Sequence, residues 1–211
     1  MIASFATIES RKAESEKTYR SLRKQTKTFG WAGMMNGRMD DARKFAADFR
    51  LERYSGYILT CDDDLIYPPD YCAYMVQKCE EHGCPVSLMG RVVTGASDSY
   101  YKDKGAVIKY DWRDPAAPET RVHIPGTGVM CYHTDQIRFS WDDFPGENMA
   151  DIMVGIACNG RVPVMRVPPP KRDWIKYQEV PDTIYDRHLN DDAEQTKYMN
   201  DTEWESLLRK V

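Results

Sequence analysis

The most constraining feature of this chain is a short apolar segment that runs directly into three aspartates. Residues 57–61, Tyr-Ile-Leu-Thr-Cys, have the length and composition of a buried strand. Asp62, Asp63 and Asp64 follow without a break, and a Pro-Pro pair comes soon after. Adjacent carboxylates repel one another where water is scarce, and a divalent cation between them relieves that repulsion. We therefore expect either a cation site at the carboxyl end of a strand or a solvated acidic turn.

The cation site is the interpretation with chemical consequences. Mg²⁺ and Mn²⁺ prefer oxygen ligands and often carry substrate phosphates on their remaining coordination positions. Open α/β sheets also bind their ligands beyond the carboxyl ends of the strands. An acidic cluster at that edge is therefore a candidate site for Mn²⁺ or Mg²⁺ together with a diphosphate.

The composition is that of a soluble globular protein of one domain. The 211 residues are 42% hydrophobic and 29% charged, and the net charge is −4. This charge disfavours a general electrostatic grip on nucleic acid. No apolar stretch is long enough to span a bilayer, and residues 1–8 resemble a first strand and not a signal peptide. The six cysteines lack CxxC or zinc-ligand spacing, so we expect reduced thiols in a cytoplasmic protein.

Expected strands alternate with expected helices, which favours an α/β layered fold. Residues 27–39 contain three glycines and little periodicity, and we predict a loop there; residues 91–104 are predicted to be a mobile polar loop. Strands are expected over residues 2–8, 57–61, 85–89, 106–110, 121–124, 129–132 and 162–167, and helices over 10–25, from 40 or 41 onward, over 68–83 and 149–158, and in a C-terminal tail where Trp204, Leu207 and Leu208 face inward.

Three further features carry chemical alternatives. Gly126, Thr127 and Gly128 precede an apolar strand, as in a plain tight turn or in a loop whose backbone approaches a ligand. Asp151 lies at a helix start, where it is either an acid stabilised by the helix dipole or a general base facing a cleft. His188 lies in a polar tail and is either solvated or a metal ligand.

Taken together and in this order, these features resemble the nucleotide-sugar glycosyltransferases of the GT-A fold, in particular bacterial and phage proteins of the family-2-like group. The three aspartates resemble the Asp-x-Asp motif, with Asp62 and Asp64 in its outer positions. Residues 126–128 resemble the glycine loop near the donor sugar. Asp151 resembles the later acidic residue that faces the acceptor, although Ala150 stands where many members carry glutamate.

Weaker matches complete the resemblance. Thr7 and Arg11 resemble the opening segment of the family, and Arg43 and Lys44 resemble a basic helix start that meets the diphosphate. His188 resembles a C-terminal metal-binding histidine. The resemblance thus implies donor binding by Thr7, Arg11, Arg43, Lys44, Asp62, Asp63, Gly126, Thr127 and Gly128, metal binding by Asp62, Asp64 and His188, and catalysis by Asp151.

The implied fold is a mixed central sheet flanked by helices in a single domain. Residues 1–90 would form the nucleotide-sugar half, residues 91–190 the acceptor half, and residues 191–211 a C-terminal helix. One departure concerns residues 27–38, which are too few for the second strand and acidic turn that such enzymes place there. The base pocket would then be simplified, or completed by another subunit in a homo-oligomer, or the protein would be inactive.

The implied function is metal-dependent transfer of a sugar, such as a hexose, from a nucleoside-diphosphate sugar to a hydroxyl acceptor. The default acceptor is a polysaccharide or a lipid-linked glycan. Asp151 would remove the acceptor proton if the reaction inverts configuration and would orient the acceptor if it retains configuration. The alternatives are a nucleotidyltransferase, a non-catalytic sugar-nucleotide-binding module on a degenerate scaffold, and a phage-type DNA-base glycosyltransferase, which the acidic net charge disfavours.

Overall fold

The main sheet of the protein is mixed and has seven strands in the part of the chain that is described. The computed structural model describes residues 1–7, 12–29, 31–36, 54–103, 105–180 and 183–207. The strands in spatial order are β2 (Trp31–Asn36), β1 (Ile2–Thr7), β3 (Tyr57–Cys61), β10 (Val129–His133), β5 (Val86–Ser87), β11 (Val164–Arg166) and β8 (Thr120–Val122).

Strand direction divides this sheet into two parts. β1 pairs in parallel with both β2 and β3, with Ser4 opposite Gly33 on one side and Thr60 on the other. β10 then runs antiparallel to both of its neighbours, β3 and β5. β11 is parallel to β5, and β8 closes the sheet in the antiparallel direction. The predicted α/β fold with a mixed sheet is therefore confirmed.

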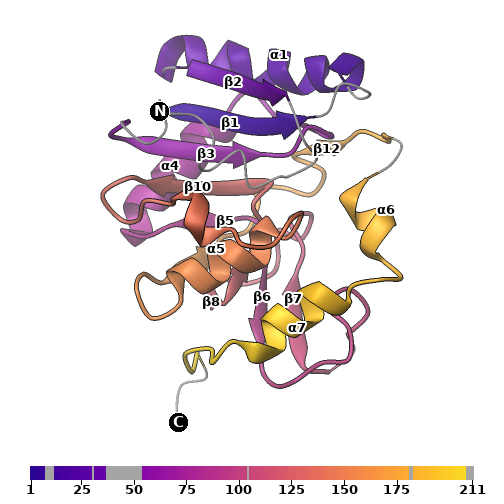
Figure 1. Ribbon diagram of the computed structural model, residues 1–211. Coiled ribbons are helices and arrows are strands. Elements are labelled where there is room, and N and C mark those ends of the chain that lie inside the picture. Colours follow the sequence, from indigo (N-terminus) through magenta and orange to yellow (C-terminus); the bar gives the residue numbers. More distant parts are fainter. Residues whose placement is uncertain (8–11, 30, 37–53, 104, 181–182, 208–211) are drawn as a thin grey trace.

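The strand order reverses between β1 and β3. From β1 the chain passes through helix α1 (Lys12–Phe29) to β2 on one side, and β3 later pairs with the other side of β1. The carboxyl ends of β1 and β3 point the same way, toward the short strand β12 (Lys176–Tyr177) (Figure 1). Such a reversal leaves a crevice outside the strand ends, which is where open α/β sheets bind ligands.

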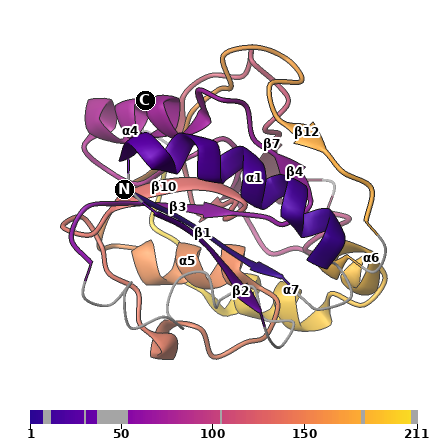
Figure 2. The ribbon, with the colours of Figure 1, turned by 90° about the horizontal axis from the view of Figure 1, so that it is seen from above.

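Helices cover both faces of the sheet. Figure 2 shows α1 and α4 (Tyr71–His82) on one face and α5 (Ala150–Cys158) with α7 (Ala193–Asp201) on the other. The period-two alternation of strand residues explains the two cores beneath these helices. In β3, Ile58 packs into the core on the α5 side, whereas Leu59 and Cys61 pack into the core on the α4 side.

Smaller elements extend this framework. A second sheet has the order β7 (Val107–Tyr110), β6 (Gly90–Val93) and β9 (Ile124–Pro125). β12 pairs antiparallel with β4 (Leu65–Ile66), which directly follows the aspartates. The remaining elements are the 3-10 turn η2 (Trp141–Asp143) and the short helix α6 (Ile184–His188).

The predicted loop over residues 27–39 is wrong, because residues 31–36 form β2. Six consecutive residues of β2 align with β1, from Ile2 opposite Trp31 to Thr7 opposite Asn36. Backbone pairing along a neighbouring strand overrides the weak intrinsic strand propensity of the Gly-containing segment. α1 continues to Phe29, so a single residue separates it from β2 and the interval is long enough for the second strand. The prediction that this region is too short for a second strand is therefore wrong. The helix expected from residue 40 or 41 lies outside the described residues.

Two other predictions are corrected. Residues 90–93 form β6 and are not part of a mobile loop, because they pair with both β7 and β9. The C-terminal helix ends at Asp201, and Trp204 lies beyond it, with its ring 5.4 Å from that of His123. Leu207 also follows the helix, and Leu208 lies outside the described residues. The predicted helices over 68–83 and 149–158 are confirmed as α4 and α5.

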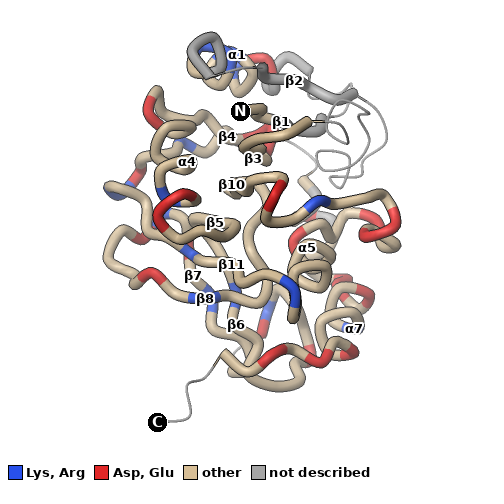
Figure 3. Tube along the Cα trace, turned by 90° about the vertical axis from the view of Figure 1, so that its left-hand side faces the viewer, with Lys and Arg blue, Asp and Glu red and all other residues tan. Residues whose placement is uncertain are grey.

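Two further features of the described chain are the distribution of its charged residues and the hydropathy of its helices. Acidic and basic residues are interspersed along the described chain (Figure 3). Within the described part, none of the helices has an apolar stretch of the length needed to cross a bilayer.

Candidate functional site

The acidic loop, residues 62–64, connects the carboxyl end of β3 to β4. Asp63 is buried, with 7% of its surface exposed, whereas Asp62 and Asp64 are partly exposed. β1 extends beyond its last pair with β3, Ser4 opposite Thr60, as far as Thr7. The acidic loop therefore lies at the reversal of strand order, the position at which the sheet topology favours a ligand.

The backbone of the acidic loop is held by side chains from distant parts of the chain. The Thr18 hydroxyl, on α1, lies 2.6 Å from the Leu65 carbonyl oxygen and 3.0 Å from that of Asp63, and donates to this pair. The backbone N–H of Gln178 donates to the Asp64 carbonyl oxygen at 2.7 Å. The side-chain amide of Gln178 donates in turn to Thr18 Oγ1 at 3.1 Å. These bonds fix the path of the loop independently of its carboxylates.

The glycine loop, residues 126–128, is a tight turn that also approaches the acidic loop closely. The backbone N–H of Val129 donates to the Gly126 carbonyl oxygen at 3.3 Å, which closes the turn. A Cβ atom at Gly128 would overlap Oδ2 and the carboxyl carbon of Asp62 and would lie 2.8 Å from Oδ1. The loop is therefore a tight turn whose backbone lies close to Asp62, and its approach to a ligand stays a prediction.

Asp151 contacts the same glycine loop from the other side. It lies in the first turn of α5, and its Oδ1 accepts the backbone N–H of Thr127 at 2.8 Å and the Thr127 hydroxyl at 2.6 Å. Thr127 is almost completely buried, with 1% of its surface exposed. Asp151 thus joins α5 to the glycine loop, and this contact gives it a positioning role whether or not it also acts as a base.

Tyr67 was not predicted as a site residue, but its hydroxyl bonds to both loops. It donates to the Gly128 carbonyl oxygen at 2.6 Å and accepts the backbone N–H of Asp62 at 2.8 Å. Thr18 and Gln178 were also missed. Tyr67 follows the aspartates closely in sequence, which is a usable signal, but Thr18 and Gln178 are far away along the chain and carry no local motif.

Several predicted site residues cannot be placed against this cluster. Arg11, Arg43 and Lys44 lie outside the described residues, and the side chain of Thr7 is not described although its backbone ends β1. His188 ends α6, with its Nδ1 3.3 Å from the Asp191 carbonyl oxygen. Their roles in binding donor or metal stay predictions.

The acidic loop is the predicted site for a cation that keeps part of its coordination shell for substrate and water. Within the described residues, no three or more His, Cys, Asp or Glu side chains form a group that could hold a metal ion. Mg²⁺ is commonly bound by only one or two protein carboxylates, with waters and substrate phosphates completing its shell. Asp62 and Asp64 would be those carboxylates here, whereas a dedicated all-protein cage is not formed by the described side chains.

The cysteines take no part in this site. All six are free and buried. Burial raises the pKa of the Cys72 and Cys158 thiols to about 12, so both are protonated and unreactive near neutral pH.

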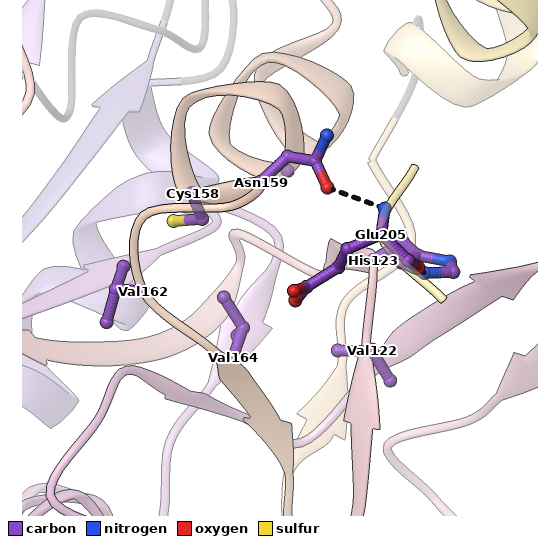
Figure 4. Close-up of a pocket in the computed structure, with 8 residues that line it drawn as sticks. Val122, His123, Cys158, Asn159, Val162, Val164 and Glu205 are labelled. Carbon is purple, nitrogen blue, oxygen red and sulfur yellow. Dashed lines mark hydrogen bonds between the residues drawn. The ribbon is translucent and has the colours of Figure 1, made fainter. Parts of the chain in front are cut away.

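A small pocket lies at the other end of α5 from Asp151. Its walls include His123, Cys158, Asn159 and Glu205, and the backbone N–H of Glu205 donates to Asn159 Oδ1 at 3.1 Å (Figure 4). None of the residues predicted to form the site lines it. It lies where the C-terminal segment packs against α5, and it is separate from the acidic and glycine loops.

Comparison with known proteins gives little. No family model matches the chain, and no curated protein does. Among solved structures, the crystal structure of A197 from STIV is similar to this chain with a TM-score of 0.45 and 15% sequence identity, over 86% of this chain and 84% of that one. This likeness is too distant to define the function of the chain.

Proposed function

We propose that this chain is a GT-A-like glycosyltransferase that moves a sugar from a nucleoside-diphosphate sugar to a hydroxyl acceptor with the help of Mn²⁺ or Mg²⁺. The observation that carries the proposal is the meeting of three sequence-distant features at one edge of the sheet. The Asp62 carboxylate lies against Gly128, and the preceding residue, Thr127, is bonded to Asp151. All three belong to motifs on which the family resemblance rests.

Asp62 and Asp64 would have one chemical role in this reaction, and Asp151 would have another. Asp62 and Asp64 would hold the cation, which when bound stabilises negative charge on the diphosphate leaving group. Asp151 would accept or orient the proton of the acceptor hydroxyl; help from a general base is worth roughly 10²–10⁴-fold in rate. The donor half and the acceptor half would then meet at the glycine loop, which contacts both Asp62 and Asp151. A polysaccharide or a lipid-linked glycan is the acceptor we propose to test first.

The test is a calorimetric titration of the protein with a panel of nucleoside-diphosphate sugars, with and without Mn²⁺. We expect binding that requires Mn²⁺ and that is lost in Asp64→Ala. The fold should survive this substitution, because the contact of residue 64 with Gln178 uses the backbone carbonyl oxygen, which alanine retains. Asp98→Ala is the matched control: it removes the same charge from an exposed position outside the three motifs.

Product analysis then separates the classes of function. Release of a nucleoside diphosphate indicates glycosyl transfer, whereas release of pyrophosphate indicates a nucleotidyltransferase. Binding without turnover indicates a non-catalytic module. Equal donor affinity of Asp64→Ala and the wild type in Mn²⁺ would refute the assignment of the acidic loop.

A further inference from the structure

The Tyr67 side chain is hydrogen-bonded to both the acidic loop and the glycine loop. Its hydroxyl donates its one proton to the Gly128 carbonyl oxygen at 2.6 Å and accepts the Asp62 N–H at 2.8 Å. The two bonded groups are separated by 66 positions in the sequence (128 − 62). One hydroxyl therefore uses both its donor and an acceptor lone pair to fix the distance between the loops.

The surroundings of Tyr67 keep this link intact. The side chain is buried, with 2% of its surface exposed, and burial raises its pKa well above the usual value. The hydroxyl is therefore protonated near neutral pH, where it donates to Gly128. Its ring packs against that of Tyr71 at a centroid distance of 4.5 Å, which holds the hydroxyl in place.

The link continues beyond Gly128 to the acid on α5. Thr127 precedes Gly128 in the same turn and donates two hydrogen bonds to Asp151 Oδ1. A continuous path of bonded groups thus runs from the backbone of Asp62 through Tyr67 and the glycine loop to Asp151. A shift of the glycine loop relative to the acidic loop would change the separation of Asp62 and Asp151 at the same time.

We propose that Tyr67 is a positioning residue that sets the geometry of the donor site by locking the acidic loop to the glycine loop. This inference rests on the proposed function, because the geometry that Tyr67 sets is that of the carboxylates assigned to the cation and the acceptor. Small displacements of such groups are costly, since misplacement by about 1 Å is enough to cost roughly 10²-fold in rate.

Tyr71 provides a matched control in the same aromatic cluster. It is completely buried and packs directly on Tyr67, yet its hydroxyl has no hydrogen-bond partner among the described residues. Replacing Tyr71 by phenylalanine removes a buried hydroxyl without cutting a link between loops. Replacing Tyr67 by phenylalanine removes a buried hydroxyl of the same kind and leaves the Gly128 carbonyl and the Asp62 N–H without this partner.

The experiment compares Tyr67→Phe, Tyr71→Phe and the wild type by titration with a nucleoside-diphosphate sugar in Mn²⁺, well below the melting temperature of each protein. We expect Tyr67→Phe to bind about tenfold more weakly per folded molecule, which corresponds to about 1.4 kcal/mol. Tyr71→Phe should bind as the wild type does. A purely structural role for Tyr67 predicts a lower melting temperature with unchanged affinity of the folded molecule, and that result would overturn the inference.

Two further outcomes keep the test decisive. Absence of Mn²⁺-dependent binding by the wild type overturns the proposed function and this inference with it, whereas equal affinity in wild type and Tyr67→Phe overturns the inference alone. If Tyr67→Phe does not fold, 3-fluorotyrosine at position 67 keeps the ring and hydroxyl but makes the hydroxyl a stronger donor and a weaker acceptor. We then expect the affinity for the nucleoside-diphosphate sugar to change by about twofold or more. An unchanged affinity counts against the role of Tyr67.

Discussion

Alanine at position 128 should damage donor binding by displacing Asp62. A Cβ atom there would overlap the Asp62 carboxylate. The φ angle of Gly128 lies outside the left-handed region, so its backbone accepts alanine without strain. The steric effect of Gly128→Ala in the described structure is therefore concentrated on one carboxylate, which is assigned to the cation.

The structure limits how this overlap can be relieved. Moving the two loops apart would stretch the bonds from Tyr67 to the Gly128 carbonyl oxygen and to the Asp62 N–H. Rotating the Asp62 side chain keeps those bonds but moves the carboxylate. Overpacking of a well-packed interior costs about 1–3 kcal/mol. We expect a stability loss in that range and, because a cation ligand is displaced, donor affinity at least about tenfold weaker in Mn²⁺.

Two alanine variants serve as controls. Gly90→Ala introduces a similar overlap outside the three motifs, with the Val122 side chain, whose two methyl carbons would lie 2.8 Å from the added Cβ. It should lose stability and keep donor affinity. Gly95→Ala meets no atom within 4 Å and should change neither property. Stability is measured by chemical denaturation, and affinity by titration with a nucleoside-diphosphate sugar and Mn²⁺. If Gly128→Ala binds the sugar nucleotide as well as Gly90→Ala does, the reasoning about Asp62 is refuted.

Two other predictions concern Asp151 and His123. Asp151→Asn should keep donor affinity within a few-fold, because the asparagine oxygen still accepts from Thr127, but it should lower sugar transfer by roughly two orders of magnitude; near-normal transfer would exclude Asp151 as the base. His123 Nδ1 accepts the N–H of Val93 at 2.9 Å, so the neutral ring carries its proton on Nε2, 2.7 Å from the Glu205 carbonyl oxygen. Burial lowers the pKa of His123, so the unfolded chain takes up this proton first as the pH falls. The free energy of unfolding should therefore decrease below about pH 6.5, and denaturation titrations of His123→Gln should show a flatter pH dependence; an identical slope in both proteins would contradict this.

Local sequence patterns were sufficient to predict the elements whose apolar side chains form a clear run or a clear period. The apolar residues of β3 and the periodic apolar face of α5 both predicted elements that are present. β2 was not predictable in this way, because its Gly-containing segment has little periodicity and is specified by backbone pairing with β1. The end of α7 was misplaced because Trp204 packs on His123 from an irregular segment and not from a helix.

The candidate site likewise combines residues found in local sequence patterns with contacts between segments that are far apart in the sequence. The sequence pointed to Asp62, Gly128 and Asp151, because acidic residues after a strand, glycines in a turn and an acid at a helix start are local patterns. It could not show that Gly128 touches Asp62, nor that Thr127 is bonded to Asp151, because these contacts join segments 66 and 24 residues apart (128 − 62 and 151 − 127). Contacts of this kind depend on the order of strands in the sheet, which the sequence alone left open.

The hydrogen bonds described above hold the acidic loop through its backbone atoms and not through its charged groups. The bonds from Thr18, Gln178 and Tyr67 all reach main-chain atoms of residues 62–65, which any amino acid other than proline supplies at those positions. Side-chain carboxylates are not needed for these bonds, and three in succession carry a repulsive cost wherever water is scarce. The path of the loop is therefore supported through its backbone, and these bonds would remain after neutral substitution of Asp62 or Asp64. Under the proposed function, in which Asp62 and Asp64 hold a cation, such substitutions should change what the loop binds far more than where it runs.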